Sequence, residues 1–197
     1  MPYSTVDGTA RAGVDYKPVS GTLVFNPGVF LVTIQVSVFA NLIDDGDRSF
    51  TVALGQPYAI VHGAPTPAGS VGTPATGVIH NDDLGGTVQW SVVAFSATAC
   101  PASATTNCSV TLTVKRFSGG AAGVSIDYAT VDGTGNALHD YVPVTDTVVF
   151  GAAEFLKTVT IPVRPGSTRG SNFGVILSNP QGGAVLGPQS TATVTLN

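Results

Sequence analysis

The sequence predicts an all-β protein made of two tandem antiparallel β-sandwiches, and three observations support this fold class. Charged residues make up 10% of the 197 residues, while glycine (24) and proline (13) are frequent, which is a composition of short strands and turns rather than of exposed helices. Apolar and polar residues alternate in several short runs. A fourteen-residue motif occurs twice, and an internal repeat of this kind indicates two copies of one domain.

The repeated motif reads YSTVDGTARAGVDY from Tyr3 and YATVDGTGNALHDY from Tyr128. The similarity continues beyond the motif into further pairs of corresponding positions: Pro18 and Pro143, Phe25 and Phe150, Val32 and Lys157, and Phe50 and Phe173. We therefore place one copy in residues 1–83 and the other in residues 84–197.

Each expected strand is an alternating run bounded by turn residues. In SVTLTVKR the apolar residues Val110, Leu112 and Val114 alternate with polar ones, which places one face on a core and the other in water. Turns rich in glycine and proline separate such runs. In chain order we expect strands at 32–38, 50–54, 88–95, 108–116, 157–163, 173–177 and 191–197. Trp90 lies within one of these runs and is expected in the core.

The first copy has no counterpart of the two leading strands of the second copy, because its similarity starts at Tyr3. We therefore expect it to lack its two N-terminal strands, which would expose an apolar inner face and unpaired sheet edges. On this interpretation either the chain is part of a longer repeat array, or a neighbouring repeat or subunit donates the missing strands.

The motif from Tyr3, the run GTLVFNPG from Gly21 and the closing pair Asp82-Asp83 together resemble the Calx-beta domain. The resemblance covers essentially the whole chain. It implies seven-strand immunoglobulin-like sandwiches, with calcium bound by loops at one end in some members. Domains of this family occur in the calcium-sensing region of sodium/calcium exchangers, in an integrin subunit and in bacterial surface proteins.

The resemblance implies calcium ligands in the first copy at four aspartates: Asp15, Asp45, Asp82 and Asp83. Calcium takes about six to eight oxygen ligands. At two further ligand positions this chain has Asn41 and Arg48, and a resident cation disfavours a second one. The alternative interpretation is that Asp15 caps a turn and that the loop 43–47 is only solvated.

In the second copy the resemblance leaves one carboxylate, Asp140, at a ligand position. Three other ligand positions hold Arg164, Thr168 and Ser171, and no acidic pair closes the domain. We expect no metal in this copy, and Asp140 is then a structural turn residue.

Cys100 and Cys108 flank a short polar segment, and we expect a disulfide between them, with a free buried pair as the alternative. A disulfide favours an oxidising compartment. The three histidines are scattered and adjoin no recognisable nucleophile, so we expect no enzyme. No cluster of lysine and arginine suits nucleic acid, and no apolar run suits membrane insertion.

Three functions remain open. The first is a non-catalytic extracellular structural or adhesive repeat of a larger surface or fibre-forming protein. The second is a calcium-binding regulatory or interaction module with its site in the first copy. The third is an accessory domain pair of a larger secreted enzyme. The expected location is extracellular or at the cell surface, the expected partners are neighbouring repeats or subunits, and calcium is the one cofactor considered.

Overall fold

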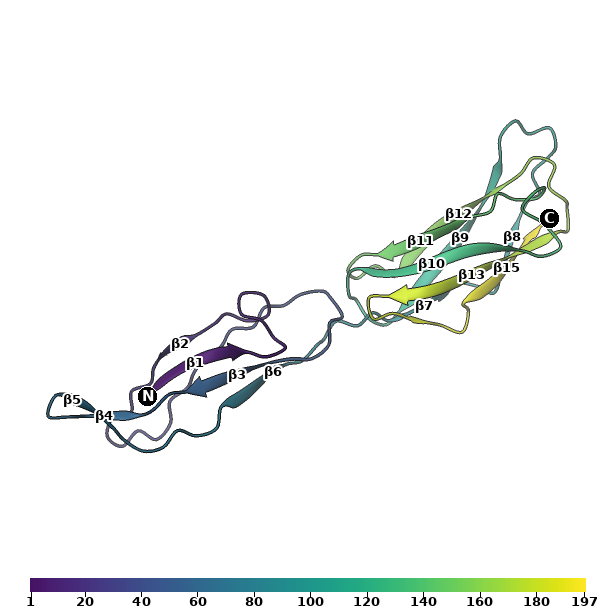
Figure 1. Cartoon of the computed structure of the whole chain (residues 1–197). Helices are drawn as coiled ribbons and strands as arrows, with labels where there is room; N and C mark the ends of the chain where they lie inside the picture. The colour runs from purple at the N-terminus through teal and green to yellow at the C-terminus, as the bar shows by residue number, and fades with distance from the viewer. The chain divides into compact units, whose positions relative to one another are not determined.

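The computed structural model describes all 197 residues and contains strands but no helix, so the predicted all-β class is confirmed (Figure 1). The chain forms two compact units. Unit 1 comprises Met1–Asn41 and Gly46–Asn81, and unit 2 comprises Leu42–Asp45 and Asp82–Asn197. No helix is available that could cross a membrane.

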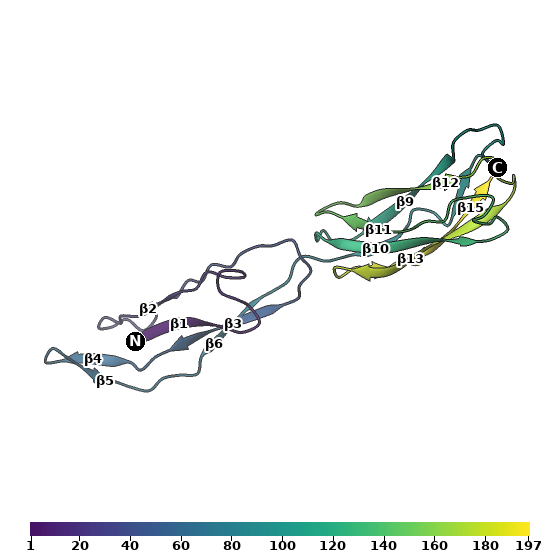
Figure 2. The same cartoon turned by 45° about the horizontal axis from the view of Figure 1, so that its top comes forward.

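Unit 2 is a sandwich of two sheets that lie face to face (Figure 2). The larger sheet has the order β11 (Thr145–Phe150), β10 (Val124–Asp132), β13 (Asn172–Gln181), β15 (Thr191–Leu196) and β8 (Ala94–Ala97). The smaller sheet has the order β12 (Leu156–Val163), β9 (Cys108–Phe117), β7 (Thr87–Trp90) and β14 (Val185–Leu186).

The core of unit 2 follows from the alternation of its strands. In β9, Val110, Leu112 and Val114 are buried while the polar residues between them are not. Trp90 is fully buried, as expected, and its ring meets those of Phe95 and Tyr128 edge to face. Full burial of each large apolar side chain stabilises the fold by about 1.5–3 kcal/mol, so this sandwich has a continuous apolar core.

The prediction of a single strand at 88–95 is wrong in detail, because the structure has two strands there, β7 and β8. β7 pairs antiparallel with β9 in the smaller sheet, whereas β8 pairs parallel with β15 in the larger one. The chain crosses between the sheets at residues 91–93, so that one run of sequence contributes an inner strand to the smaller sheet and an edge strand to the larger one.

Unit 1 has one sheet of the same kind. Its order is β2 (Ser20–Thr22), β1 (Pro2–Asp7), β3 (Arg48–Leu54) and β6 (Ala75–Ile79), with a separate hairpin of β4 (Tyr58–Val61) and β5 (Ala64–Pro67). The register repeats that of unit 2, since Tyr3 faces Leu54 as Tyr128 faces Leu177. This sheet is therefore the counterpart of β11, β10, β13 and β15.

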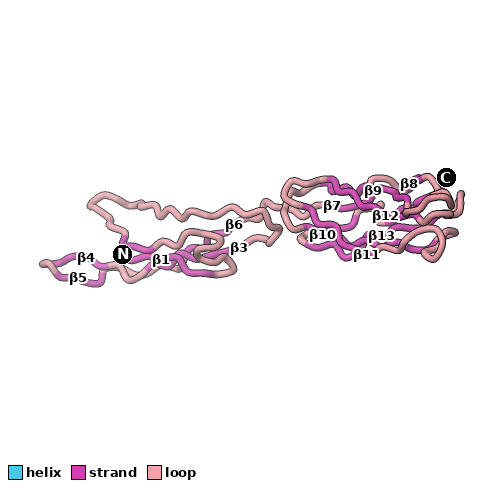
Figure 3. The backbone as a smooth tube through the Cα atoms, turned by 90° about the horizontal axis from the view of Figure 1, so that it is seen from above, coloured by secondary structure: helices cyan, strands magenta, loops and turns pink.

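The second sheet is missing from unit 1, which confirms that the first copy lacks strands. The strand expected at 32–38 is wrong: residues 23–47 contain no strand, apart from a single bridge between Tyr16 and Val38 (Figure 3). The corresponding β12 pairs with β9 over its whole length, and unit 1 has no counterpart of β9. Without that partner the backbone groups of 32–38 cannot form a ladder.

Candidate metal centre

The repeated motif forms the same hydrogen-bonded corner in both units. In unit 1 the Tyr16 hydroxyl donates to Asp7 Oδ1 at 2.6 Å, and the Ala12 amide donates to the same oxygen at 2.9 Å. In unit 2 the Tyr141 hydroxyl and the Ala137 amide donate to Asp132 Oδ1 at 2.5 and 2.9 Å. The first aspartate of each motif therefore has a structural role, because its carboxylate accepts the hydrogen bonds that form the corner.

The tyrosines of this corner also pack in the apolar core of each unit. Tyr16 stacks on Phe50 with a centroid distance of 4.5 Å, and Tyr141 stacks on Phe173 at 4.2 Å. Burial, followed by the hydrogen bond to Asp132, raises the pKa of Tyr141 above its ordinary value. The hydroxyl thus stays protonated and remains a donor at every physiological pH.

Asp15, the first candidate ligand, is buried with 6% of its surface exposed. Its Oδ2 accepts the Arg11 amide at 2.7 Å, and its Oδ1 accepts the Arg48 guanidinium at 2.8 Å. Both carboxylate oxygens therefore accept hydrogen bonds within unit 1. The positive charge beside them is the guanidinium of Arg48.

The other three candidate ligands belong to unit 2. Asp82 is exposed, while Asp45 and Asp83 are half-buried. Within neither unit does the structure arrange three or more histidine, cysteine, aspartate or glutamate side chains as a metal site. Two hydrogen bonds fasten the segment that carries Asp45: Asp44 Oδ2 accepts the Gly85 amide at 2.9 Å, and the Leu42 carbonyl accepts the Ala122 amide at 2.5 Å.

Asp47 and His80 lie in unit 1 and meet at the surface. His80 Nδ1 is 2.8 Å from Asp47 Oδ2, and the Asn81 amide donates to Asp47 Oδ1 at 2.8 Å. The hydrogen bond from Asn81, and next that from His80, lowers the pKa of Asp47. His80 thus contacts Asp47, a residue outside the predicted ligand set.

Arg116 is a structural residue of this region that the sequence reasoning missed. It is 2% exposed and donates to the carbonyl oxygens of Gly85, Ala121 and Leu84 at 2.8, 2.8 and 3.0 Å. Burial lowers the pKa of its guanidinium. Its position could have been read from β9, because Arg116 has the same parity as the buried Val114 and so points to the same face.

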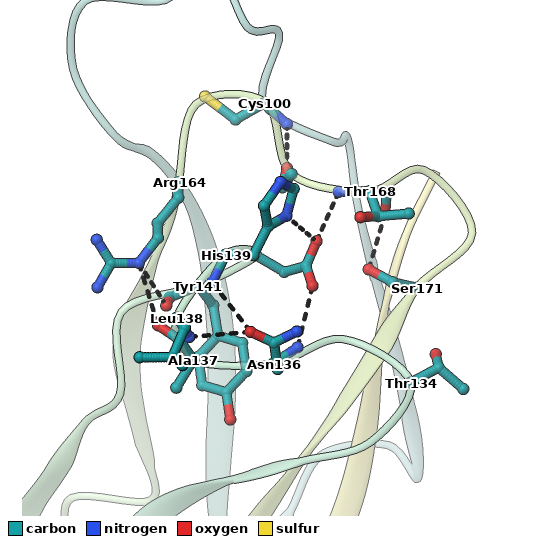
Figure 4. Close-up of polar contacts among 12 residues, drawn as sticks. Cys100, Thr134, Asn136, Ala137, Leu138, His139, Tyr141, Arg164, Thr168 and Ser171 are labelled. Carbon is teal, nitrogen blue, oxygen red and sulfur yellow. Dashed lines mark hydrogen bonds and ion pairs between the residues drawn. The ribbon is translucent and has the colours of Figure 1, made fainter.

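In unit 2 the position equivalent to Asp15 is Asp140, which is 2% exposed. Its Oδ1 accepts the Thr168 amide at 2.6 Å and lies 3.1 Å from His139 Nδ1, while its Oδ2 accepts the Asn136 amide at 3.0 Å (Figure 4). Burial opposes ionisation, but these hydrogen bonds outweigh it and lower the pKa of Asp140 to about 2.

The loop around Asp140 is fastened by further contacts rather than by carboxylates. Arg164 Nε donates to the carbonyls of Ala137 and Tyr141 at 3.2 and 3.0 Å. Cys100 and Cys108 are joined by a disulfide, and the Cys100 amide donates to Ser167 Oγ at 2.8 Å. The disulfide loop and the loop 164–171 are thereby connected.

Comparison with known proteins agrees with this fold. The Calx-beta domain profile matches residues 1–83 and 89–197. The chain belongs to the Calx-beta family. The resemblance predicted from the motifs is therefore confirmed.

The Calx-beta chain is similar to sodium/calcium exchangers. It is 30% identical over 194 residues to sodium/calcium exchanger 2 of Rattus norvegicus, covering 92% of this chain and 20% of the relative. It is 28% identical over 198 residues to sodium/calcium exchanger 3 of Homo sapiens, covering 92% and 21%. The chain thus spans about one-fifth of the length of these relatives.

Solved structures show the same fold. The crystal structure of CBD12 from CALX1.2 matches with a TM-score of 0.51 and 22% identity over 100% of this chain and 86% of that one. The crystal structure of calcium binding domain CBD12 of CALX1.1 matches with a TM-score of 0.51 and 23% identity over 99% and 86%. At this identity the likeness concerns the tandem Calx-beta architecture alone.

The chemistry of the carboxylates suits calcium only in part. The side chains of Asp45, Asp82 and Asp83 supply the hard oxygen donors that calcium prefers. Asp15 does not fit while the Arg48 guanidinium and the Arg11 amide occupy its oxygens. Around Asp140 the partners are backbone amides and an imidazole, which are not the oxygen ligands that calcium takes.

Proposed function

We propose that this Calx-beta pair is a non-catalytic regulatory or interaction module of a larger protein, and that it binds calcium through Asp45, Asp82 and Asp83. The observation that carries the proposal is the similarity to sodium/calcium exchangers over 92% of the chain. This function replaces the structural or adhesive one as the leading interpretation, because the relatives are named as exchangers and not as surface fibres.

The three proposed ligands belong to one compact unit. Asp45 lies in the segment Leu42–Asp45, which is part of the same compact unit as Asp82 and Asp83. The contacts of Asp44 with Gly85 and of Leu42 with Ala122 fasten that segment to unit 2. A loop held in this way loses less conformational entropy when it binds an ion.

The number of carboxylates in the proposed set determines the expected affinity. Three carboxylates are fewer than the strongest calcium sites provide, and affinity rises with the number and charge of ligands. We therefore expect a dissociation constant of about 10⁻⁴ to 10⁻³ M, in the range of weak calcium modules.

Calorimetric titration of the whole chain with calcium chloride tests this proposal. Asp82→Asn should abolish or strongly weaken the heat of binding, because it removes a charged oxygen donor from an exposed position. Asp146→Asn is the matched control, since Asp146 is also exposed and outside the proposed set. Absence of binding up to about 10 mM calcium, or equal loss in both variants, would contradict the proposal.

An extracellular structural module stays a second candidate because of the Cys100–Cys108 disulfide, which favours an oxidising compartment. The similarity to exchangers does not support this location. Mass spectrometry of the protein from its native source, with free thiols alkylated before extraction, tests it. Alkylated Cys100 and Cys108 would exclude this candidate.

A further inference from the structure

A groove of about 320 Å³ lies between β11 and β12 of unit 2, and we call it the β11–β12 groove. Each of these strands is the edge strand of its sheet. The polar part of the lining consists of a tyrosine, an aspartate, a lysine and three threonines: Tyr128, Asp146, Lys157, Thr147, Thr158 and Thr160. A cavity of this size in which polar groups converge is a candidate ligand site.

Tyr128, Asp146 and Lys157 occupy inward positions of their strands. Each has the same parity as the buried apolar residues beside it, such as Val148 on β11 and Val159 on β12, so it points toward the space between the sheets. Tyr128 and Asp146 are also direct cross-strand partners in the register of β10 and β11. Polar residues at core positions depart from the pattern of the fold, and such departures gather at functional sites.

Comparison of the two repeats shows that the fold does not require this aspartate. Tyr3 pairs with Gly21 in unit 1, where unit 2 has Asp146 opposite the equivalent tyrosine. At the same offset in the sequence, Val32 holds the position of Lys157. A Calx-beta sheet therefore forms with glycine in place of Asp146, and both charges are a property of the second copy.

Two polar groups of the groove have no partner within the protein. Tyr128 is 6% exposed, and its hydroxyl forms no hydrogen bond. Asp146 Oδ1 accepts the Thr147 amide at 2.8 Å, whereas its Oδ2 accepts none. Burial, and next the charge of Asp146, raises the pKa of Tyr128, so its hydroxyl keeps the proton and remains a donor. An almost buried hydroxyl without a partner costs free energy until a ligand or water pairs with it.

The charges of the groove favour a neutral ligand. Asp146 repels an anion, while Lys157, whose ammonium lies 2.8 Å from Glu154, repels a cation. The carboxylate accepts hydrogen bonds, the ammonium and the phenol donate them, and the threonine hydroxyls do both. Neighbouring hydroxyl groups on a sugar ring also donate and accept, so they match this mixed set without carrying a charge.

We propose that the β11–β12 groove of unit 2 binds a neutral saccharide, with Asp146 accepting hydrogen bonds from neighbouring sugar hydroxyls and Tyr128 donating one. The volume of the groove lies near the lower end of small-ligand sites, which suits one or two sugar rings. Binding at this site requires no calcium and is independent of the function proposed above.

Saturation-transfer NMR of the whole chain is the first experiment. The probes are the methyl glycosides of glucose, mannose, galactose and N-acetylglucosamine, each at about 10 mM. Saturation should reach at least one glycoside, and that glycoside should shift the backbone amide signals of β11 and β12. Transfer to none of these glycosides, or shifts confined to other strands, would overturn the proposal.

Two variants identify the groups that bind. Tyr128→Phe removes the free hydroxyl and keeps the ring, and Asp146→Asn removes the charged acceptor. Each should weaken binding of the glycoside at least about tenfold. Thr193→Val removes an exposed hydroxyl from the outer face of β15 and should change binding by less than about twofold. Equal effects of all three variants would overturn the proposal.

The other role open to the inward charges is to keep edge strands from pairing with a second chain. If they serve only that role, light scattering should show that Asp146→Asn associates, while the wild type binds no glycoside, and this result would overturn the proposal. Asp146→Asn lies outside the calcium set, so it should lose the glycoside and retain the heat of calcium binding. The two proposals can therefore fail separately.

Discussion

Asp15 and Asp140 occupy the same position of the two repeats, yet their buried charges are compensated differently. Asp15 has the Arg48 guanidinium at 2.8 Å, whereas Asp140 has two backbone amides and the His139 imidazole. A buried carboxylate needs such partners, because removing it from water without them is costly. In each unit the protein itself provides compensation that a bound cation would otherwise supply.

The low pKa of Asp140 predicts a pH-dependent contribution to stability. Its folded-state pKa of about 2 lies below the ordinary 3.8, so the contribution is complete above about pH 5 and is lost as the pH falls through 2. Asp140→Asn should lower the free energy of unfolding by about 2 kcal/mol at neutral pH. Urea unfolding followed by Trp90 fluorescence measures it.

The same measurement near pH 2 is the control. There the wild-type carboxylate is about half protonated in the folded state and almost fully protonated in the unfolded state, so the difference between wild type and Asp140→Asn should shrink. A difference of equal size at both pH values would show that shape, and not charge, accounts for the loss.

At the scale of the element, residues 32–38 and β12 demonstrate that an alternating sequence forms a β-strand only when a second segment pairs with it. Both segments alternate, and both were expected to be strands. β12 forms eight residue pairs with β9, while 32–38 has a single bridge. Alternation predicted the direction of the side chains correctly in both, because that depends on the local backbone. The ladder depends on a second segment, which unit 1 does not contain.

The loop between β8 and β9 carries the disulfide, and its removal should weaken unit 2. Closing the loop 100–108 restricts the unfolded chain, which for a loop of this length is worth about 2–3 kcal/mol. The double variant Cys100→Ser and Cys108→Ser should therefore lower the midpoint of thermal unfolding of unit 2. A reducing agent should lower the wild-type midpoint similarly and leave the double variant unchanged; a wild-type midpoint unaffected by reduction would contradict this.

At the scale of the whole molecule, the two repeats differ in how much core they bury. The buried apolar cluster of unit 2 has 22 members, while that of unit 1 has three: Ala10, Tyr16 and Phe50. Since apolar burial is the main favourable contribution to folding, unit 1 alone has little to offset its conformational entropy.

Hydrogen exchange of the chain without partners should reveal this difference. We expect amides of β1 and β3 to exchange at least about tenfold faster than those of β10 and β13, although the two pairs have the same register. Equal protection of both pairs would mean that unit 1 is stabilised by something other than its core.

The two copies, their sandwich class and the corner of Asp7 and Tyr16 could be predicted from the sequence alone, because they depend on alternation and on residues close together in the chain. The tertiary structure decided the rest. It paired Asp15 with Arg48, brought Leu42–Asp45 into unit 2, placed Arg116 against Gly85 and left 32–38 with a single bridge in place of a strand ladder. Each of these features joins or separates segments far apart in the chain, and no local pattern specifies which distant groups will satisfy one another.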